Sequence, residues 1–160
     1  MGKQRGFPFI FSDMLATDAY HHGLPIPEGL ELTPPIMNFG PDGGGSPDKP
    51  IGSFGPHSSP AGFIYCDDSF PVKLRGSYLI GRFGSMQQGW ETGYDILKVD
   101  LNKNSKGIYE AKMETLIAPL SRPTDMLKAN GRVYILEFNR QNHVSKPWSG
   151  TGRLLELTWD

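Results

Sequence analysis

Proline and glycine interrupt this chain so often that long helices are excluded. Its 160 residues include 20 glycines and 14 prolines, both above ordinary usage. Proline removes a backbone donor and glycine weakens a helix interior, so this spacing favours short strands joined by turns. We therefore expect an all-β protein of one domain's length, with a core of moderate size.

The interruptions are concentrated before residue 60. Prolines and glycines recur there every few residues and include the run Gly43-Gly44-Gly45. They leave no room for a regular element of useful length, and only a short helical turn is expected near Ser12–Tyr20. The pattern divides the chain into a Pro/Gly-rich loop segment, residues 1–60, and a strand-rich part, residues 61–160. The two are expected to pack together as one domain.

Seven strands are predicted after this segment, at intervals of about ten residues. They begin near Ala61, Ser77, Gly93, Tyr109, Arg122, Arg132 and Gly152. Period-two alternation is clearest in Tyr94–Leu101, and Asn130-Gly131 between two apolar runs is typical of a tight hairpin. The first four strands are expected to form one antiparallel sheet and the last three an incomplete second one. This count is typical of the end of a β-propeller, although a sandwich or barrel would use the same strands.

Short motifs along the chain resemble, in order, those of the glucose/sorbosone dehydrogenases. Gly55–Tyr65 is similar to the segment that opens a blade in that family, and Ser69–Ile80 to its connector and second strand. Ser121–Met126 resembles the "RP-x-D-V" that opens the next blade, Asn130–Glu137 the "DG-x-L-Y-V" that follows, and Gly152–Leu157 the closing "G-R-I-x-R-I". The resemblance implies a partial β-propeller, with about one four-stranded blade and a three-stranded incomplete blade.

The resemblance also implies an activity. Active relatives oxidise an aldose or similar polyol by hydride transfer to pyrroloquinoline quinone (PQQ), held with Ca²⁺ over the central opening of the propeller. This chain would then be the C-terminal portion of such an oxidoreductase, with a sugar or polyol as the substrate of the full-length protein. The family's catalytic histidine would lie upstream of Met1, so the isolated chain is expected to be inactive. The family is usually periplasmic or extracytoplasmic, but the sequence shows no signal peptide.

Arg122 is the residue that the resemblance places at the cofactor. It matches the first arginine of the "R-x-R-D" of active members, Thr124 replaces the second, and Asp125 keeps the acidic position. A planar guanidinium suits the carboxylates of PQQ. The alternative is that Arg122 pairs with Asp125 or caps a turn.

Arg82 and His57, near the expected site, each have a functional and a structural interpretation. Active relatives place a lysine where this chain has Phe83 or Gly84, and Arg82 is a substitute charge or a rim residue on a solvated edge. His57, in a turn before the first strand, is the only candidate proton acceptor, or else a turn histidine bonded to backbone. No other catalytic residue and no metal site is predicted.

Charge and composition exclude several classes of function. The net charge is −1 without a basic cluster, which argues against nucleic acid as a partner. No apolar stretch is long enough for a membrane span, and the single Cys66 excludes an internal disulfide. Because one arginine and the lysine of the family are absent, a non-catalytic propeller module that binds carbohydrate or a protein is the alternative. Uncovered blade faces are expected to meet the missing blades or to self-associate.

Overall fold

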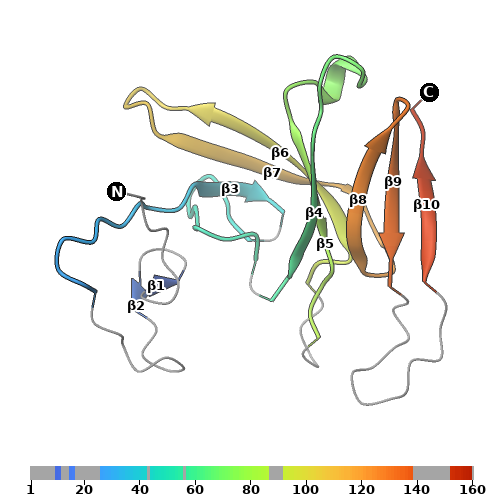
Figure 1. Cartoon of the computed structure of the whole chain (residues 1–160). Helices are drawn as coiled ribbons and strands as arrows, with labels where there is room; N and C mark the ends of the chain where they lie inside the picture. The colour runs from blue at the N-terminus through green and yellow to red at the C-terminus, as the bar shows by residue number, and fades with distance from the viewer. Residues whose placement is uncertain are drawn as a thin grey trace.

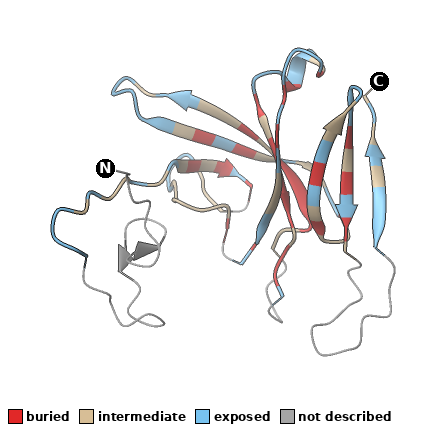
Figure 2. Cartoon of the chain, in the orientation of Figure 1, coloured by how far each residue is buried: buried red, intermediate tan, exposed pale blue. Residues whose placement is uncertain are grey.

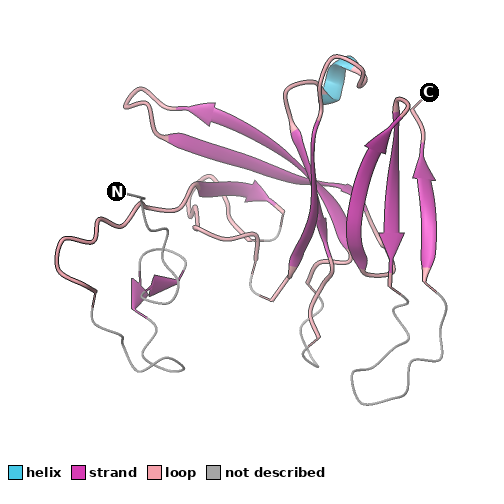
Figure 3. Cartoon of the chain, in the orientation of Figure 1, coloured by secondary structure: helices cyan, strands magenta, loops and turns pink. Residues whose placement is uncertain are grey.

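Strands make up nearly all of the regular structure (Figure 3). The computed structural model describes residues 10–11, 15–16, 26–42, 44–55, 57–86, 92–138 and 152–159. Within these residues there are ten strands and one short 3₁₀ helix, η1 (Val72–Leu74). The all-β expectation is confirmed.

The larger sheet has five strands in the order β3-β7-β6-β5-β4. They are β3 (Met37–Pro41), β4 (Pro60–Tyr65), β5 (Tyr78–Arg82), β6 (Asp95–Lys103) and β7 (Tyr109–Ile117). Strands β4 to β7 form an antiparallel meander, as predicted for the first sheet. Ile96 and Leu97 point to opposite faces of β6 and are both fully buried, so this strand is covered on both sides.

Strand β3 corrects the expectation that the Pro/Gly-rich segment holds no regular element. It pairs in parallel with β7 at the edge of the sheet, so the sheet is five-stranded and mixed. Met37-Asn38-Phe39 lies between the prolines, and Pro41 ends the strand, where the missing N–H costs little. The helical turn predicted near Ser12–Tyr20 is wrong where it is described, because Leu15–Ala16 (β2) pairs with Ile10–Phe11 (β1). The rest of that range lies outside the described residues.

The smaller sheet is antiparallel and three-stranded, in the order β10-β9-β8. It consists of β8 (Pro123–Ala129), β9 (Arg132–Glu137) and β10 (Arg153–Leu157). Asn130 and Gly131 both have positive φ, 51° and 74°, between β8 and β9. The predicted hairpin is therefore confirmed, for the reason that both residue types tolerate this conformation.

The two sheets pack face to face, with β4 beside β8 (Figure 1). The core between them is made of residues from both sheets and from their connecting segments: Ile64, Cys66, Phe70, Leu74, Leu79, Ile96, Leu120, Met126, Val133 and Ile135. Gly62 permits the close approach, because a Cβ at this residue would lie 2.8 Å from the backbone nitrogen of Met126. Burial raises the pKa of the Cys66 thiol to about 11, so the cysteine acts as a core residue.

Large apolar side chains are also exposed on the outward sides of both sheets, and Figure 2 shows exposed positions on strands of each sheet. On the larger sheet the rings of Phe63 and Tyr78 stack with centroids 5.0 Å apart, and Phe63 is 62 % exposed. On the smaller sheet Leu127, Leu136 and Leu154 are exposed. Strands β4 and β9 thus bury apolar side chains on one side and expose large apolar side chains on the other. Exposed apolar faces of this kind are typical of surfaces that meet another protein element.

Candidate functional site

One end of the two sheets gathers the predicted site residues. Strand β5 ends at Arg82 and β6 begins at Asp95, and these residues are paired. Pro60, the first residue of β4, pairs with Arg82 as well. Strand β8 begins at Pro123, directly after Arg122. We call this end, with the segments 83–86, 92–94 and 118–122 that border it, the loop end.

Arg122 lies close to two aromatic rings at the loop end. The central carbon of its guanidinium is 4.9 Å from the centroid of the Phe83 ring and 4.8 Å from that of Tyr94. Nη1 donates to the carbonyl oxygen of Ser85 at 3.0 Å, and Nη2 donates to the hydroxyl of Tyr94 at 3.2 Å. Nε is buried without a hydrogen-bond partner among the described residues. Since a guanidinium has five N–H donors, one N–H on each terminal nitrogen is left outside these bonds.

The bonds of Arg122 test one of the alternatives considered from the sequence, the pairing with Asp125. Its terminal nitrogens bond to residues of the loop after β5 and not to Asp125, whose carboxylate accepts from the backbone N–H of Met126 at 2.8 Å. The pairing with Asp125 is therefore wrong. Asp125 lies on β8, where its side chain is exposed, while Arg122 precedes the strand with a φ of 60°.

Phe83 occupies one of the two positions at which the resemblance implies a lysine. A lysine there would place a second cation against the Arg122 guanidinium, whereas the face of a phenyl ring attracts it. Phe83 also contacts Phe138, with ring centroids 5.9 Å apart. Thr124, at the position of the second family arginine, donates from its hydroxyl to the carbonyl oxygen of Leu136 at 3.0 Å. Its side chain thus links β8 to β9.

Arg82 is an internal ion-pair centre. Its side chain is 3 % exposed, so the interpretation as a rim residue on a solvated edge is wrong. Nε and Nη2 bond to the two carboxylate oxygens of Asp95, at 2.8 and 2.5 Å. Nη1 bonds to the carbonyl oxygen of Phe54 at 2.5 Å and lies 3.5 Å from Oδ2 of Asp42. Each nitrogen of this guanidinium already has an acceptor within the protein.

The segment after β3 supplies one side of this ion-pair centre. Asn38 is fully buried, and its Nδ2 donates to Oδ1 of Asp42 at 2.9 Å and to the carbonyl oxygen of Ser53 at 2.8 Å. The N–H of Gly44 donates to the same Asp42 oxygen at 3.0 Å. The Pro/Gly-rich segment is therefore folded over the end of β5, which removes Arg82 from solvent.

His57 lies in an exposed turn before β4, as expected, with a φ of 60°. The carbonyl oxygen of the next residue, Ser58, accepts from the N–H of Gly84 at 2.9 Å, so the turn rests on the loop that follows β5. The structure places His57 at the loop end, and its role as a proton acceptor stays a prediction.

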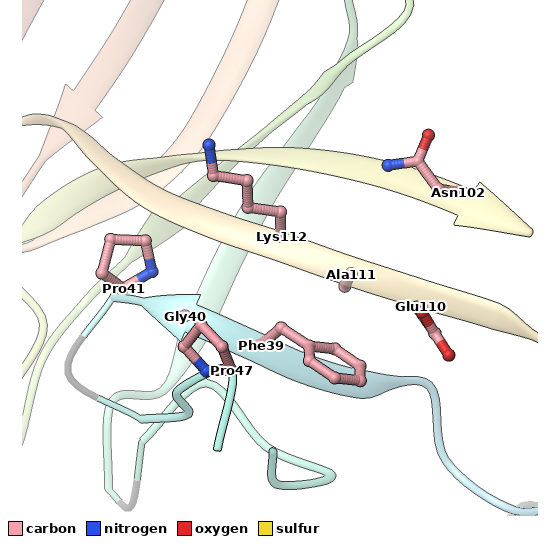
Figure 4. Close-up of a pocket in the computed structure, with 8 residues that line it drawn as sticks. All are labelled: Phe39, Gly40, Pro41, Pro47, Asn102, Glu110, Ala111 and Lys112. Carbon is pink, nitrogen blue, oxygen red and sulfur yellow. The ribbon is translucent and has the colours of Figure 1, made fainter. Parts of the chain in front are cut away.

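Two hollows lie away from Arg122. One, of about 340 Å³, lies beside β3 and β7 and is lined by Phe39, Gly40, Pro41, Pro47, Asn102, Glu110, Ala111 and Lys112 (Figure 4). The other, of about 440 Å³, is an apolar groove between the segment before β4 and the outward face of the larger sheet. Its lining includes Phe54, Phe63 and Tyr78. The sequence motifs pointed to neither hollow.

The loop-end residues fit part of the chemistry that PQQ requires. Arg122 is a planar cation with N–H groups to spare, which suits a carboxylate. Arg82 does not fit, because its donors are used internally. Within the described residues no group of three or more His, Cys, Asp or Glu side chains is arranged to hold a metal ion.

Sequence reasoning missed the residues that position both arginines. Asp95 faces Arg82 across paired strands. This pair could have been predicted, because a charged residue ends one predicted strand and an oppositely charged residue begins the next. Asp42 and Tyr94 gave no comparable signal, since they reach their arginines only through the tertiary fold.

No family model matches this chain, and no curated protein and no solved structure matches it either. Among the described residues, none of the helical structure is long and apolar enough to span a bilayer.

Proposed function

We propose that this chain supplies two adjacent blades of a β-propeller of the glucose/sorbosone dehydrogenase type, and that Arg122 contacts a carboxylate of PQQ at the loop end. The chain is then the C-terminal portion of a sugar dehydrogenase-like oxidoreductase whose site is completed by upstream blades. PQQ, when bound, accepts hydride from the sugar or polyol. Arg82 and Thr124 hold the loop end together and do not contact the cofactor.

The packing of the sheets supports the blade part of this proposal. A four-stranded meander, β4 to β7, packs on the three-stranded sheet β8 to β10 with first strands side by side. Both outward faces carry exposed apolar side chains, such as Phe63 and Leu136. In a propeller each blade is covered on both faces by its neighbours, so apolar residues on both sides of every sheet are expected.

The geometry of Arg122 carries the cofactor part of the proposal. Its guanidinium contacts the rings of Phe83 and Tyr94. Its terminal nitrogens each use one N–H in a bond within the protein, so the second N–H of each lies outside these bonds. A guanidinium fixed in this way loses little entropy when it binds a carboxylate, and charge-assisted bonds are about twice as strong as neutral ones. The ortho-quinone PQQ is planar and carries carboxylates, which are the groups such a site recognises.

The test is a titration of the 160-residue chain with PQQ, with and without Ca²⁺, followed by absorbance. We expect a saturable shift, weakened about tenfold or more in Arg122→Ala, because one charge-assisted bond is lost. Arg122→Lys is expected to lie between the two, since it keeps the charge and loses the planar pair of donors.

Arg132→Ala is the matched control. Arg132 is exposed on β9 and pairs with Glu156 at 2.6 Å, away from the loop end, so its loss should leave the PQQ affinity unchanged. The cofactor proposal is wrong if the unaltered chain gives no saturable shift, or if Arg132→Ala weakens binding as much as Arg122→Ala.

A second candidate function is a non-catalytic propeller module that binds carbohydrate or a protein. The internal neutralisation of Arg82 favours it, because only one cation of the expected set remains for a ligand. A chain that keeps its β-type circular dichroism, binds no PQQ and binds the neutral probe maltotriose in isothermal titration would support this candidate against the first.

A further inference from the structure

Backbone strain is concentrated at the loop end. Five non-glycine residues among those described have positive φ, and four of them border this end: His57, Ser59, Tyr94 and Arg122. Such a conformation is unfavourable for a residue with a side chain, and it persists only where the surroundings determine it. Two of these residues, Tyr94 and Arg122, contact each other through their side chains.

The backbone of Tyr94 is held from both sides. Its N–H donates to the carbonyl oxygen of Arg82 at 3.0 Å, and its own carbonyl oxygen accepts from the N–H of Leu120 at 2.6 Å. A Cβ at Gly84 would lie 2.6 Å from the Tyr94 ring, so glycine at that position leaves room for the ring. Tyr94 is 8 % exposed and has little freedom to move.

The side chain of Tyr94 restrains Arg122 in two ways. Its ring centroid lies 4.8 Å from the central carbon of the guanidinium, within the range of a cation–π contact. Its hydroxyl donates to the carbonyl oxygen of Ser85 at 2.6 Å and accepts from Nη2 of Arg122, while the same Ser85 oxygen accepts from Nη1. These three bonds form a closed set that prevents rotation of the guanidinium within its plane.

We propose that Tyr94 is the positioning residue of the Arg122 site, and that it holds the guanidinium in the one orientation that presents its remaining N–H groups to a ligand carboxylate. The proposal rests on the proposed function for the identity of the ligand. It does not rest on that function for the restraint itself, which is a property of the free protein.

The experiment replaces Tyr94 by phenylalanine, which keeps the ring and the strained backbone and removes the hydroxyl. The first measurement is the Nε–Hε signal of Arg122 in ¹⁵N NMR spectra of the free protein, assigned by its disappearance in Arg122→Lys. We expect an upfield-shifted signal with slow solvent exchange in the unaltered protein, because Nε is buried and the guanidinium lies close to two rings. In Tyr94→Phe it should broaden and exchange at least tenfold faster.

The second measurement is the PQQ titration. Tyr94→Phe is expected to weaken binding about tenfold, as the loss of a bond to a charged group does. Tyr109→Phe is the matched control, because Tyr109 also covers a cation, Lys103 at 5.0 Å, but at the far end of β6 and β7. It should change neither the Arg122 signal nor the affinity. Phe83→Leu, which removes the other ring, is the second variant if Tyr94→Phe does not fold, and it should also release the signal.

The two proposals fail in different ways. If the unaltered chain binds no PQQ but Tyr94→Phe releases the Arg122 signal, Tyr94 positions the guanidinium and the cofactor assignment is wrong. If PQQ binds through Arg122 and Tyr94→Phe leaves both the signal and the affinity unchanged, the positioning role is overturned.

Discussion

The two arginines at the loop end show how neighbouring contacts assign different roles to one residue type. All three nitrogens of Arg82 have acceptors, which are the carboxylates of Asp95 and Asp42 and the carbonyl oxygen of Phe54, and the side chain is buried. Arg122 is bound by neutral acceptors and by aromatic faces, so its charge is not cancelled by a carboxylate among the described residues. An anionic ligand is attracted by the second arrangement and not by the first.

We expect Arg82→Met to destabilise the chain by about 3–5 kcal/mol. The substitution leaves the carboxylates of Asp95 and Asp42 buried without their cation, and removal of one partner of a buried ion pair has this cost. Urea unfolding followed by circular dichroism measures the change. Arg132→Ala, on the exposed face of β9, should leave the free energy of unfolding nearly unchanged, because solvent screens an exposed ion pair. A loss below about 1 kcal/mol in Arg82→Met would contradict the assignment of Arg82 as an ion-pair centre.

Among the elements, β3 differs most from expectation. Proline and glycine density argued against any strand before residue 60, yet Met37–Pro41 extends the larger sheet. Its stability comes from distant partners: β7 along one edge, Ile51 through an isolated bridge, and Asn38 through buried side-chain bonds. Local propensity is a weak guide where such partners determine the conformation.

Strands β6 and β7 carry a charge cluster that makes stability depend on pH. Nζ of Lys98 lies 2.6 Å from Oδ2 of Asp100 and 3.1 Å from Oε1 of Glu114, and the Ser77 hydroxyl donates to Oδ1 of Asp100 at 2.5 Å. Burial acts to raise the pKa of Asp100, but the hydrogen bonds from Lys98 and Ser77 outweigh it and hold that pKa below its ordinary value of 3.8.

A lowered pKa stabilises the folded state above the ordinary pKa, and this contribution is lost as the pH falls through the lower folded value. The free energy of unfolding should fall as the pH is lowered from about 5 to 2, and we expect this fall to be smaller in Asp100→Asn than in the unaltered protein. The change should not exceed about 1 kcal/mol, since the Asp100 side chain is 32 % exposed. Urea unfolding at a series of pH values measures it. The exposed Asp68→Asn is the control, and an equal effect in both variants would contradict the role of the cluster.

In the whole molecule, apolar side chains gather in three layers: between the two sheets and on the outward side of each sheet. One lies between the sheets and is buried. The second, on the outward side of the larger sheet, is partly covered by Phe54 and leaves Phe63 exposed. The third, on the outward side of the smaller sheet, includes the exposed Leu136. Strand β10 is also an edge of the smaller sheet. Exposed apolar faces and open edges both favour association with other chains.

We expect the isolated 160-residue chain to oligomerise or aggregate, as measured by light scattering. Phe63→Lys combined with Leu136→Lys should shift the distribution toward monomer, because each places a charge on an outward face. Val72→Lys is the matched control, since Val72 is 79 % exposed but lies on η1. A monodisperse monomer of the unaltered chain would contradict this prediction and weaken the assignment of the sheets as propeller blades.

The expected strands were recovered where the signal is local. Strands β4 to β10 begin and end near the predicted residues, because alternation and turn residues act within a few positions. The aromatic partners of Arg122 do not follow from the sequence motifs. Phe83 and Tyr94 are separated from Arg122 by 39 and 28 positions, and no periodicity relates positions so far apart.

The sequence by itself therefore determined the β class, the succession of the seven strands and the Asn130-Gly131 hairpin. These depend on the conformational preferences of neighbouring residues. Three features depend on the tertiary structure: β3 joins the sheet in parallel, Arg82 is buried, and Arg122 contacts two aromatic rings. Each of these depends on a long-range approach, such as that of Asp42 to Arg82, 40 positions apart, which is favourable only once both sheets have formed.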